Sequence, residues 1–151
     1  MRIEEAIQQT KPFRNAWHRA TVNILYTNNW VQEKIKGELK PYGITMQQYN
    51  VLRVLRGAGK PISTSVIRDR LLDKMADTSR MVERLYQKGL VLRNSCRHDK
   101  RLVDVSISSE GEKLLDSLKR INPGMDEILR NLTEEEAEVL SELLDKARGG
   151  Q

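Results

Sequence analysis

The chain has 151 residues and a mass of 17.4 kDa, which suits one compact domain with a helical extension and excludes two large independent domains. Hydrophobic residues make up 38% and charged residues 31%, with 9 Gly and 4 Pro, so the composition indicates a soluble, helix-rich protein and excludes a disordered or collagen-like chain. The net charge of +5 favours a polyanionic partner.

The charge is unevenly distributed along the chain. Residues 1–44 carry 7 basic and 4 acidic side chains, residues 45–108 carry 13 and 6, and residues 109–151 carry 6 and 11. The positive field therefore belongs to the middle of the chain. The single cysteine, Cys96, cannot form an internal disulfide, and no segment has the length of a signal peptide or of a membrane-spanning helix. We therefore expect a cytoplasmic protein with no membrane contact.

Two helices are predicted in the first part of the chain. Apolar residues recur every three or four positions over about 12–40, and Pro12 suits the first turn of this long amphipathic helix. Pro41 and Gly43 should stop it. Thr45 is a suitable cap for a second helix over 46–56.

The next segments have the form of a helix-turn-helix. Ser63 or Thr64 should cap a short helix that runs through Leu72, and a further helix should follow an interruption at residues 73–75 and end before Gly89. Strands are predicted at 90–94 and 101–107, joined by a polar loop. A helix-turn-helix followed by a hairpin is a winged-helix arrangement, which fits duplex DNA.

Two capping signals predict the closing helices. Ser108 or Ser109 should cap the first of them, and Ser109 with Glu112 fits a capping box. Thr133 with Glu136 predicts a second capping box at the start of the last helix.

The second helix of the helix-turn-helix supplies the expected groove-facing residues. Once Met81, Val82 and Leu85 are assigned to the core, its remaining side chains are Asp77, Thr78, Ser79, Arg80 and Arg84. Arg80 can make a bidentate contact to guanine, and Arg84 is better placed for a phosphate. Ser63 and Thr64 are candidates for contacts to the DNA backbone, and a solvated helix face is the plain alternative.

The hairpin loop is a second cluster of cations. Arg97, His98, Lys100 and Arg101 lie within six residues, and such a cluster repels itself unless an anion meets it. We expect Arg97, Lys100 and Arg101 to contact DNA and Asp99 to orient Arg101. An ordinary solvated loop remains the alternative.

These features resemble the MarR family of bacterial transcriptional regulators over nearly the whole chain. The residues that carry the resemblance are Leu85, Lys88, Gly89, Leu90, Val91, Asp99, Arg101, Val103, Val105, Ile107, Ser108 and Gly111. The resemblance implies a mainly α fold with a small β-hairpin wing, in which 45–108 form the winged helix-turn-helix and 12–44 with 109–148 form a helical dimerisation region. It also implies a homodimer bound to a pseudo-palindromic site in double-stranded DNA, with Arg101 in the minor groove. Asp77 departs from this chemistry, because a carboxylate repels phosphate.

The resemblance further implies a repressor that is released by a small aromatic or phenolic effector, bound between the dimer helices and the winged module. Trp17, His18, Trp30 and Tyr49 are the aromatic candidates for that cleft, although residues at this helical spacing more often belong to a core. No cofactor is implied.

Other functions are weaker on sequence grounds. An enzyme is not supported, because neither histidine nor Cys96 has an identifiable catalytic partner. A metal site at Cys96, His98 and Asp99 would need a fourth ligand. Two alternatives stay open: a redox-sensing regulator that uses Cys96, and an architectural or protein-interaction winged helix without sequence specificity.

Overall fold

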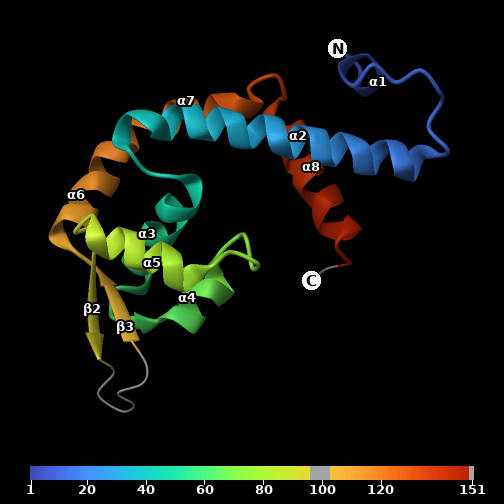
Figure 1. Cartoon of the computed structure of the whole chain (residues 1–151). Coiled ribbons are helices and arrows are strands. Elements are labelled where there is room, and N and C mark those ends of the chain that lie inside the picture. Colours follow the sequence, from blue (N-terminus) through green and yellow to red (C-terminus); the bar gives the residue numbers. More distant parts are fainter. Residues whose placement is uncertain (96–102, 150–151) are drawn as a thin grey trace.

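The computed structural model describes residues 1–95 and 103–149, and shows a mainly helical chain with one small sheet (Figure 1). The helices are α1 (Ile3–Ala6), α2 (Ala16–Leu39), α3 (Met46–Ala58), α4 (Thr64–Arg70), α5 (Thr78–Gln87), α6 (Ser109–Leu118), α7 (Asn122–Asp126) and α8 (Glu134–Ala147). Short 3-10 turns occur at Lys40–Tyr42, Lys119–Ile121 and Glu127–Leu129. Strands β1 (Ile62–Ser63), β2 (Val91–Ser95) and β3 (Val103–Ile107) form an antiparallel sheet in the order β1-β3-β2. The predicted fold class is confirmed.

The long first helix, α2, begins later than predicted. Its first residue is Ala16 because the Asn15 side chain accepts a hydrogen bond from the His18 amide at 2.8 Å, which satisfies a free helix donor. Pro12 therefore lies outside the helix, and the expected start there is wrong. The preceding residues form α1, a four-residue helix that the sequence did not indicate and that an ion pair between Glu4 and Arg19 holds at 2.6 Å.

The next helix, α3, begins as predicted and ends two residues later. Thr45 and Gln48 form a reciprocal capping box, with distances of 3.1 Å and 3.2 Å between side chain and backbone. Gly59 ends the helix in the left-handed conformation at φ 62°. The buried face of α3 then supplies Val51, Leu52 and Leu55 to the core.

The core of the winged module lies between α3, α4, α5, the sheet and α6. Its fully buried side chains include Ile67 of α4, Leu85 of α5, Val105 of β3 and Leu118 of α6. Strand β1, which was not predicted, pairs Ile62 with Val105. A two-residue strand carries too short a pattern to be recognised, and only its pairing with β3 defines it.

The start of α6 corrects a predicted cap. Ser108, not Ser109, is the cap, and its hydroxyl accepts from the Gly111 amide at 3.0 Å while it donates to the Gly89 carbonyl at 2.6 Å. Glu112 does not close a capping box, because its carboxylate accepts a hydrogen bond from Arg56 at 2.6 Å. A contact from another element therefore decides between two adjacent serines.

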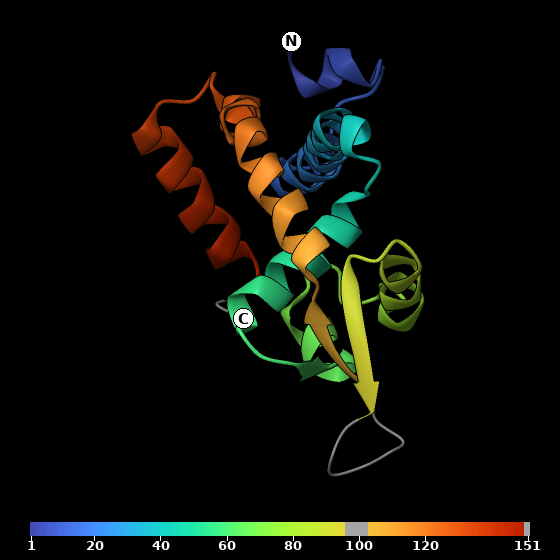
Figure 2. The same ribbon diagram turned by 90° about the vertical axis from the view of Figure 1, so that its left-hand side faces the viewer.

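The helical extension stands away from the winged module. Helix α2 extends far beyond the module (Figure 1). Helix α8 runs downward below the middle of α2 in Figure 1 and stands apart from α6 in Figure 2. The predicted Thr133–Glu136 capping box starts α8, but no residue of α8 is buried. Among the described residues, no helix combines the length and the apolar character needed to cross a bilayer.

Candidate nucleic-acid interface

Helices α4 and α5 form the expected helix-turn-helix, and α5 presents a polar face. Val82 and Leu85 of α5 are buried in the module, while Ser79, Arg80 and Arg84 are exposed as predicted. Among the described residues, neither guanidinium has an ion-pair partner. The face therefore presents two cations without ion pairs to described residues and one hydroxyl, which can bind an anionic surface that also forms hydrogen bonds.

Asp77 caps the start of this helix and is exposed beside its polar face. It is the N-cap of α5, and its carboxylate accepts a hydrogen bond from the Arg80 amide at 3.0 Å. A carboxylate at a helix N-terminus also interacts favourably with the helix dipole. The unusual acidic residue thus has a structural role that fixes the backbone beneath Arg80.

Thr78 corrects the list of groove-facing residues. Its side chain is buried, with only 6% of the residue exposed, and its hydroxyl donates to the Ala76 carbonyl at 3.4 Å. The first residue of α5 faces α4 because the tight turn brings the two helices together there. The expectation that Thr78 lies on the exposed face is wrong.

A hollow of about 220 Å3 separates the starts of α4 and α5, and it places one predicted backbone contact beside the helix face. Thr64 and Ser79 line it together with Arg68, which the sequence analysis did not select. Ser63 is not part of the lining of this hollow: its hydroxyl caps α4 through the Val66 amide and also hydrogen-bonds the Ser65 hydroxyl at 2.8 Å. The signal that could have identified Arg68 is its own exposed position next to the turn.

The hairpin strands are described, but the loop between them is not. β2 and β3 pair from Val91 opposite Ile107 to Ser95 opposite Val103. The predicted loop residues Cys96, Arg97, His98, Asp99, Lys100 and Arg101 lie outside the described residues, so their roles stay predictions.

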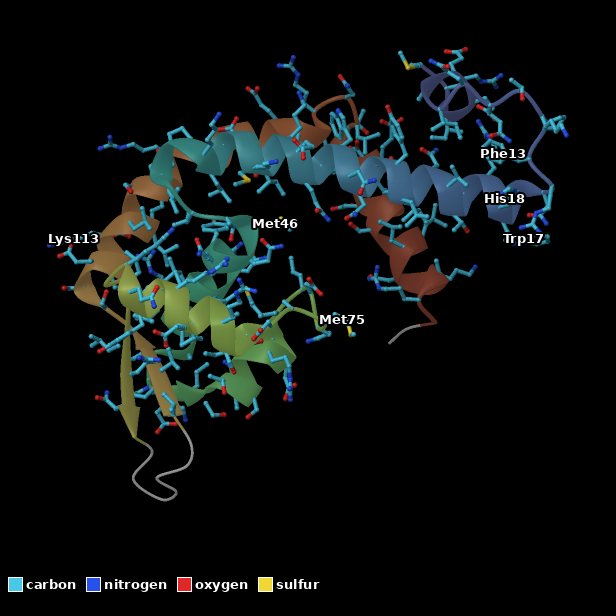
Figure 3. The ribbon with its side chains drawn as sticks, in the orientation of Figure 1. Phe13, Trp17, His18, Met46, Met75 and Lys113 are labelled. Carbon is cyan, nitrogen blue, oxygen red and sulfur yellow. The ribbon has the colours of Figure 1, made fainter. Side chains whose placement is uncertain are left out.

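The four aromatic candidates do not gather in one cleft. Trp17 is 81% exposed near the start of α2, next to His18, whose ring meets Phe13 edge to face at 5.3 Å (Figure 3). Trp30 lies further along the same straight helix, where 13 residues span about 20 Å. Tyr49 lines one cavity and Trp30 lines a separate hollow with Lys34 and Glu38, while Trp17 is not a core residue. The four side chains therefore do not meet within one chain, and their part in an effector site stays a prediction.

The cavity beside Tyr49 lies between the helical extension and the winged module and has a volume of about 660 Å3. Its lining comes from Ile35 of α2, from α3 and from Leu115 and Lys119 of α6 and the turn after it. Arg53 packs its guanidinium 5.6 Å from the centre of the Tyr49 ring. The lining therefore combines apolar side chains with three cations, Arg53, Arg56 and Lys119, and one carboxylate, Asp126.

An ion cluster closes the same boundary on the α6 side. Arg56 of α3 bonds the carboxylates of Glu112 at 2.6 Å and Asp116 at 3.0 Å. The hydrogen bond from Lys119, with the positive charges of Lys119 and Arg56, holds the pKa of Asp116 below its usual value. Within residues 1–95 and 103–149, no group of three His, Cys, Asp or Glu side chains could hold a metal ion.

Comparison with known proteins agrees with this geometry. The chain matches the sequence model of the MarR family over residues 42–102. It is 33% identical to the HTH-type transcriptional repressor MdtR of Bacillus subtilis over 110 residues, which are 70% of this chain and 68% of that protein. It is 31% identical to the multiple antibiotic resistance protein MarR of Salmonella typhimurium over 127 residues, which are 82% of this chain and 87% of that protein.

Two solved structures resemble the whole fold. A mutant MarR from E. coli in complex with operator DNA superimposes with a TM-score of 0.76 at 28% identity, covering 82% of this chain and 89% of that one. An organohalide-sensing transcriptional regulator in its 2,4-dichlorophenol-bound form gives a TM-score of 0.83 over 95% of this chain and 88% of that one. The latter is only 20% identical, so its likeness concerns the fold alone.

Proposed function

The chain belongs to the MarR family and is a DNA-binding transcriptional regulator, not an enzyme; from this premise we propose that it is a homodimeric repressor that a small aromatic or phenolic molecule releases from a pseudo-palindromic operator. In this proposal residues 45–108 form the DNA-reading module. Residues 12–44 and 109–148 form the dimerisation region.

The observation that carries the proposal is the outward face of α5. Ser79, Arg80 and Arg84 share this exposed face, and the two arginines are free of ion pairs with described residues. In the major groove Arg80 reads a guanine edge and Arg84 binds a phosphate. Arg97, Lys100 and Arg101 extend the contact to the backbone and the minor groove, with Asp99 orienting Arg101.

Exposed apolar side chains support the homodimer. They lie on α2 and α8, away from the winged module, and comprise Ile24, Leu25, Tyr26, Val139, Leu140 and Leu143. Exposed apolar side chains in such number are normally covered by a partner, and a second copy covers them with two-fold symmetry. The symmetry then places two α5 helices on half-sites about one helical turn apart.

The cavity beside Tyr49 supports release by an effector. It lies where the dimerisation region meets the winged module, so a bound molecule can favour one relative arrangement of the two. The Tyr49 ring suits an aromatic ligand, and Arg53 and Lys119 suit a phenolate or carboxylate. The 2,4-dichlorophenol-bound regulator of the same fold supports this class of effector.

The first test is selection from a random duplex library by the purified protein at about 150 mM salt, since DNA affinity depends strongly on salt. We expect enrichment of an inverted repeat with half-sites about one helical turn apart. Bound DNA without enrichment would instead indicate an architectural protein. No binding even at low salt would indicate a protein-interaction module.

A further inference from the structure

Arg93 joins β2, the first strand of the hairpin, to α5. In the sheet it lies opposite Val105, on the inner face that also carries Val91. Both valines are fully buried, whereas the Arg93 side chain is 33% exposed. A long cationic side chain thus occupies the point where the apolar core between the strand and the helix ends.

Two residues of α5 receive the Arg93 guanidinium. It forms an ion pair with the Glu83 carboxylate, and it lies 3.9 Å from the centre of the Tyr86 ring. Gln87 donates a further hydrogen bond to Glu83 at 3.2 Å. Glu83 and Tyr86 are three residues apart and share one side of the helix, so a single planar group contacts both.

These contacts add a directional restraint to the packing of α5. Val82 and Leu85 anchor α5 through apolar packing, which is not itself directional. A guanidinium that binds a carboxylate and stacks on a ring is directional in both contacts. It therefore fixes the rotation of α5 about its axis, and that rotation decides where Arg80 and Arg84 point.

We propose that Arg93 is a positioning residue for DNA recognition, which through Glu83 and Tyr86 locks α5 and the hairpin strands into one orientation. The inference rests on the proposed function, because α5 and the hairpin must both meet the duplex. It also accounts for an acidic residue on a DNA-reading helix: Glu83 orients Arg93, and Arg93 neutralises its charge.

The decisive experiment is Glu83→Gln, because two explanations predict opposite signs. If only charge matters, removal of a carboxylate near DNA strengthens binding. If Glu83 positions the helix, the selected operator binds about tenfold more weakly, within the range for coupled residue pairs. We expect the weaker binding, and a gain in affinity would overturn the proposal.

Arg93→Met should weaken operator binding by a similar factor, and the double variant Glu83→Gln/Arg93→Met should be no weaker than the worse single variant. Lys113→Met is the matched control, since it removes one positive charge from the outer side of α6, where Lys113 forms an ion pair with Glu110 (Figure 3). Additive losses in the double variant would mean that Arg93 and Glu83 act separately, which would refute the proposal.

The ring contact has its own pair of variants. Tyr86→Phe keeps the aromatic face and should bind the operator like wild type, whereas Tyr86→Leu should bind several-fold more weakly. Equal affinities of the two variants would contradict a stacking role. Thermal unfolding checks that each variant is folded before its affinity is compared.

Amide hydrogen exchange of the DNA-free protein separates this proposal from the proposed function. Arg93→Met should speed exchange in β2, β3 and α5 and leave α2 unchanged. If wild type selects no operator but this local change occurs, the proposed function fails, and what stands is only that Arg93 holds α5 against the hairpin strands. If exchange is unchanged, the positioning role is refuted whatever the DNA result.

Discussion

Gly111 lies near the start of α6, directly against the backbone at the end of the hairpin. A Cβ atom there would be 2.3 Å from the Leu90 carbonyl oxygen and 2.7 Å from Cγ1 of Ile107. We expect Gly111→Ala to lower the free energy of unfolding by about 1–3 kcal/mol, because backbone must move. Urea unfolding at fixed protein concentration measures the change.

Gly57 of α3 provides the control for that experiment. Nothing lies within 4 Å of the position of its added Cβ, and the residue is helical. Gly57→Ala should therefore raise the free energy of unfolding by about 0.5–1 kcal/mol. An unchanged Gly111→Ala protein would show that α6 does not pack against Leu90 in solution.

Arg80 and Arg84 should separate base reading from phosphate binding. We expect Arg80→Ala to cost about 1–3 kcal/mol of operator binding and to relax the base preference at one position of each half-site. Arg84→Ala and Arg101→Ala should weaken operator and random DNA alike. Fluorescence anisotropy with matched and mutated operators distinguishes these outcomes, and operator affinities equal to wild type would refute both assignments.

At the scale of elements, α6 is docked on α3 through charges that depend on pH. The pKa of Asp116 is lowered by its hydrogen bond from Lys119 and by the nearby charges, so its carboxylate stabilises the fold above the pKa of the unfolded chain. That contribution is lost as the pH falls through the lower, folded-state pKa.

The expected result is a Tm of wild type slightly above that of Asp116→Asn near neutral pH, with the two values converging as the pH falls through the lowered pKa of Asp116. The difference is small because the side chain is exposed and solvent screens its charge. Scanning calorimetry over this pH range measures it. A difference that grows on acidification would contradict the assigned ion pair.

At the scale of the whole molecule, the exposed apolar face of α8 predicts an obligate partner. Leu143 is 58% exposed, and a lysine there would place a charge within the proposed dimer interface. We expect Leu143→Lys to shift sedimentation toward a monomer and to weaken operator binding, since each half-site then binds alone.

Met75→Lys serves as the matched control for this change. Met75 is also exposed, but it belongs to the turn between α4 and α5 and not to α8 (Figure 3). We expect the sedimentation of the Met75→Lys protein to equal that of wild type. If Leu143→Lys also sediments like wild type, α8 does not form the dimer interface.

Sequence alone was sufficient at several helix ends where a hydrogen bond closes within one helical turn. The Thr45 cap, the capping box of Thr133 and the left-handed Gly89 after α5 each involve residues a few positions apart, and all three were predicted. The polar face of α5 followed from its apolar spacing for the same reason.

The tertiary structure decided every feature that depends on a distant partner. Ser108 caps α6 because its hydroxyl also meets the Gly89 carbonyl, and β1 exists because Ile62 pairs with Val105. Thr78 is buried because α4 folds back over it, and Arg93 acquires its role only where β2 meets α5. Local periodicity specifies which residues form a helix or strand, whereas the contact of one element with another depends on docking that no local pattern encodes.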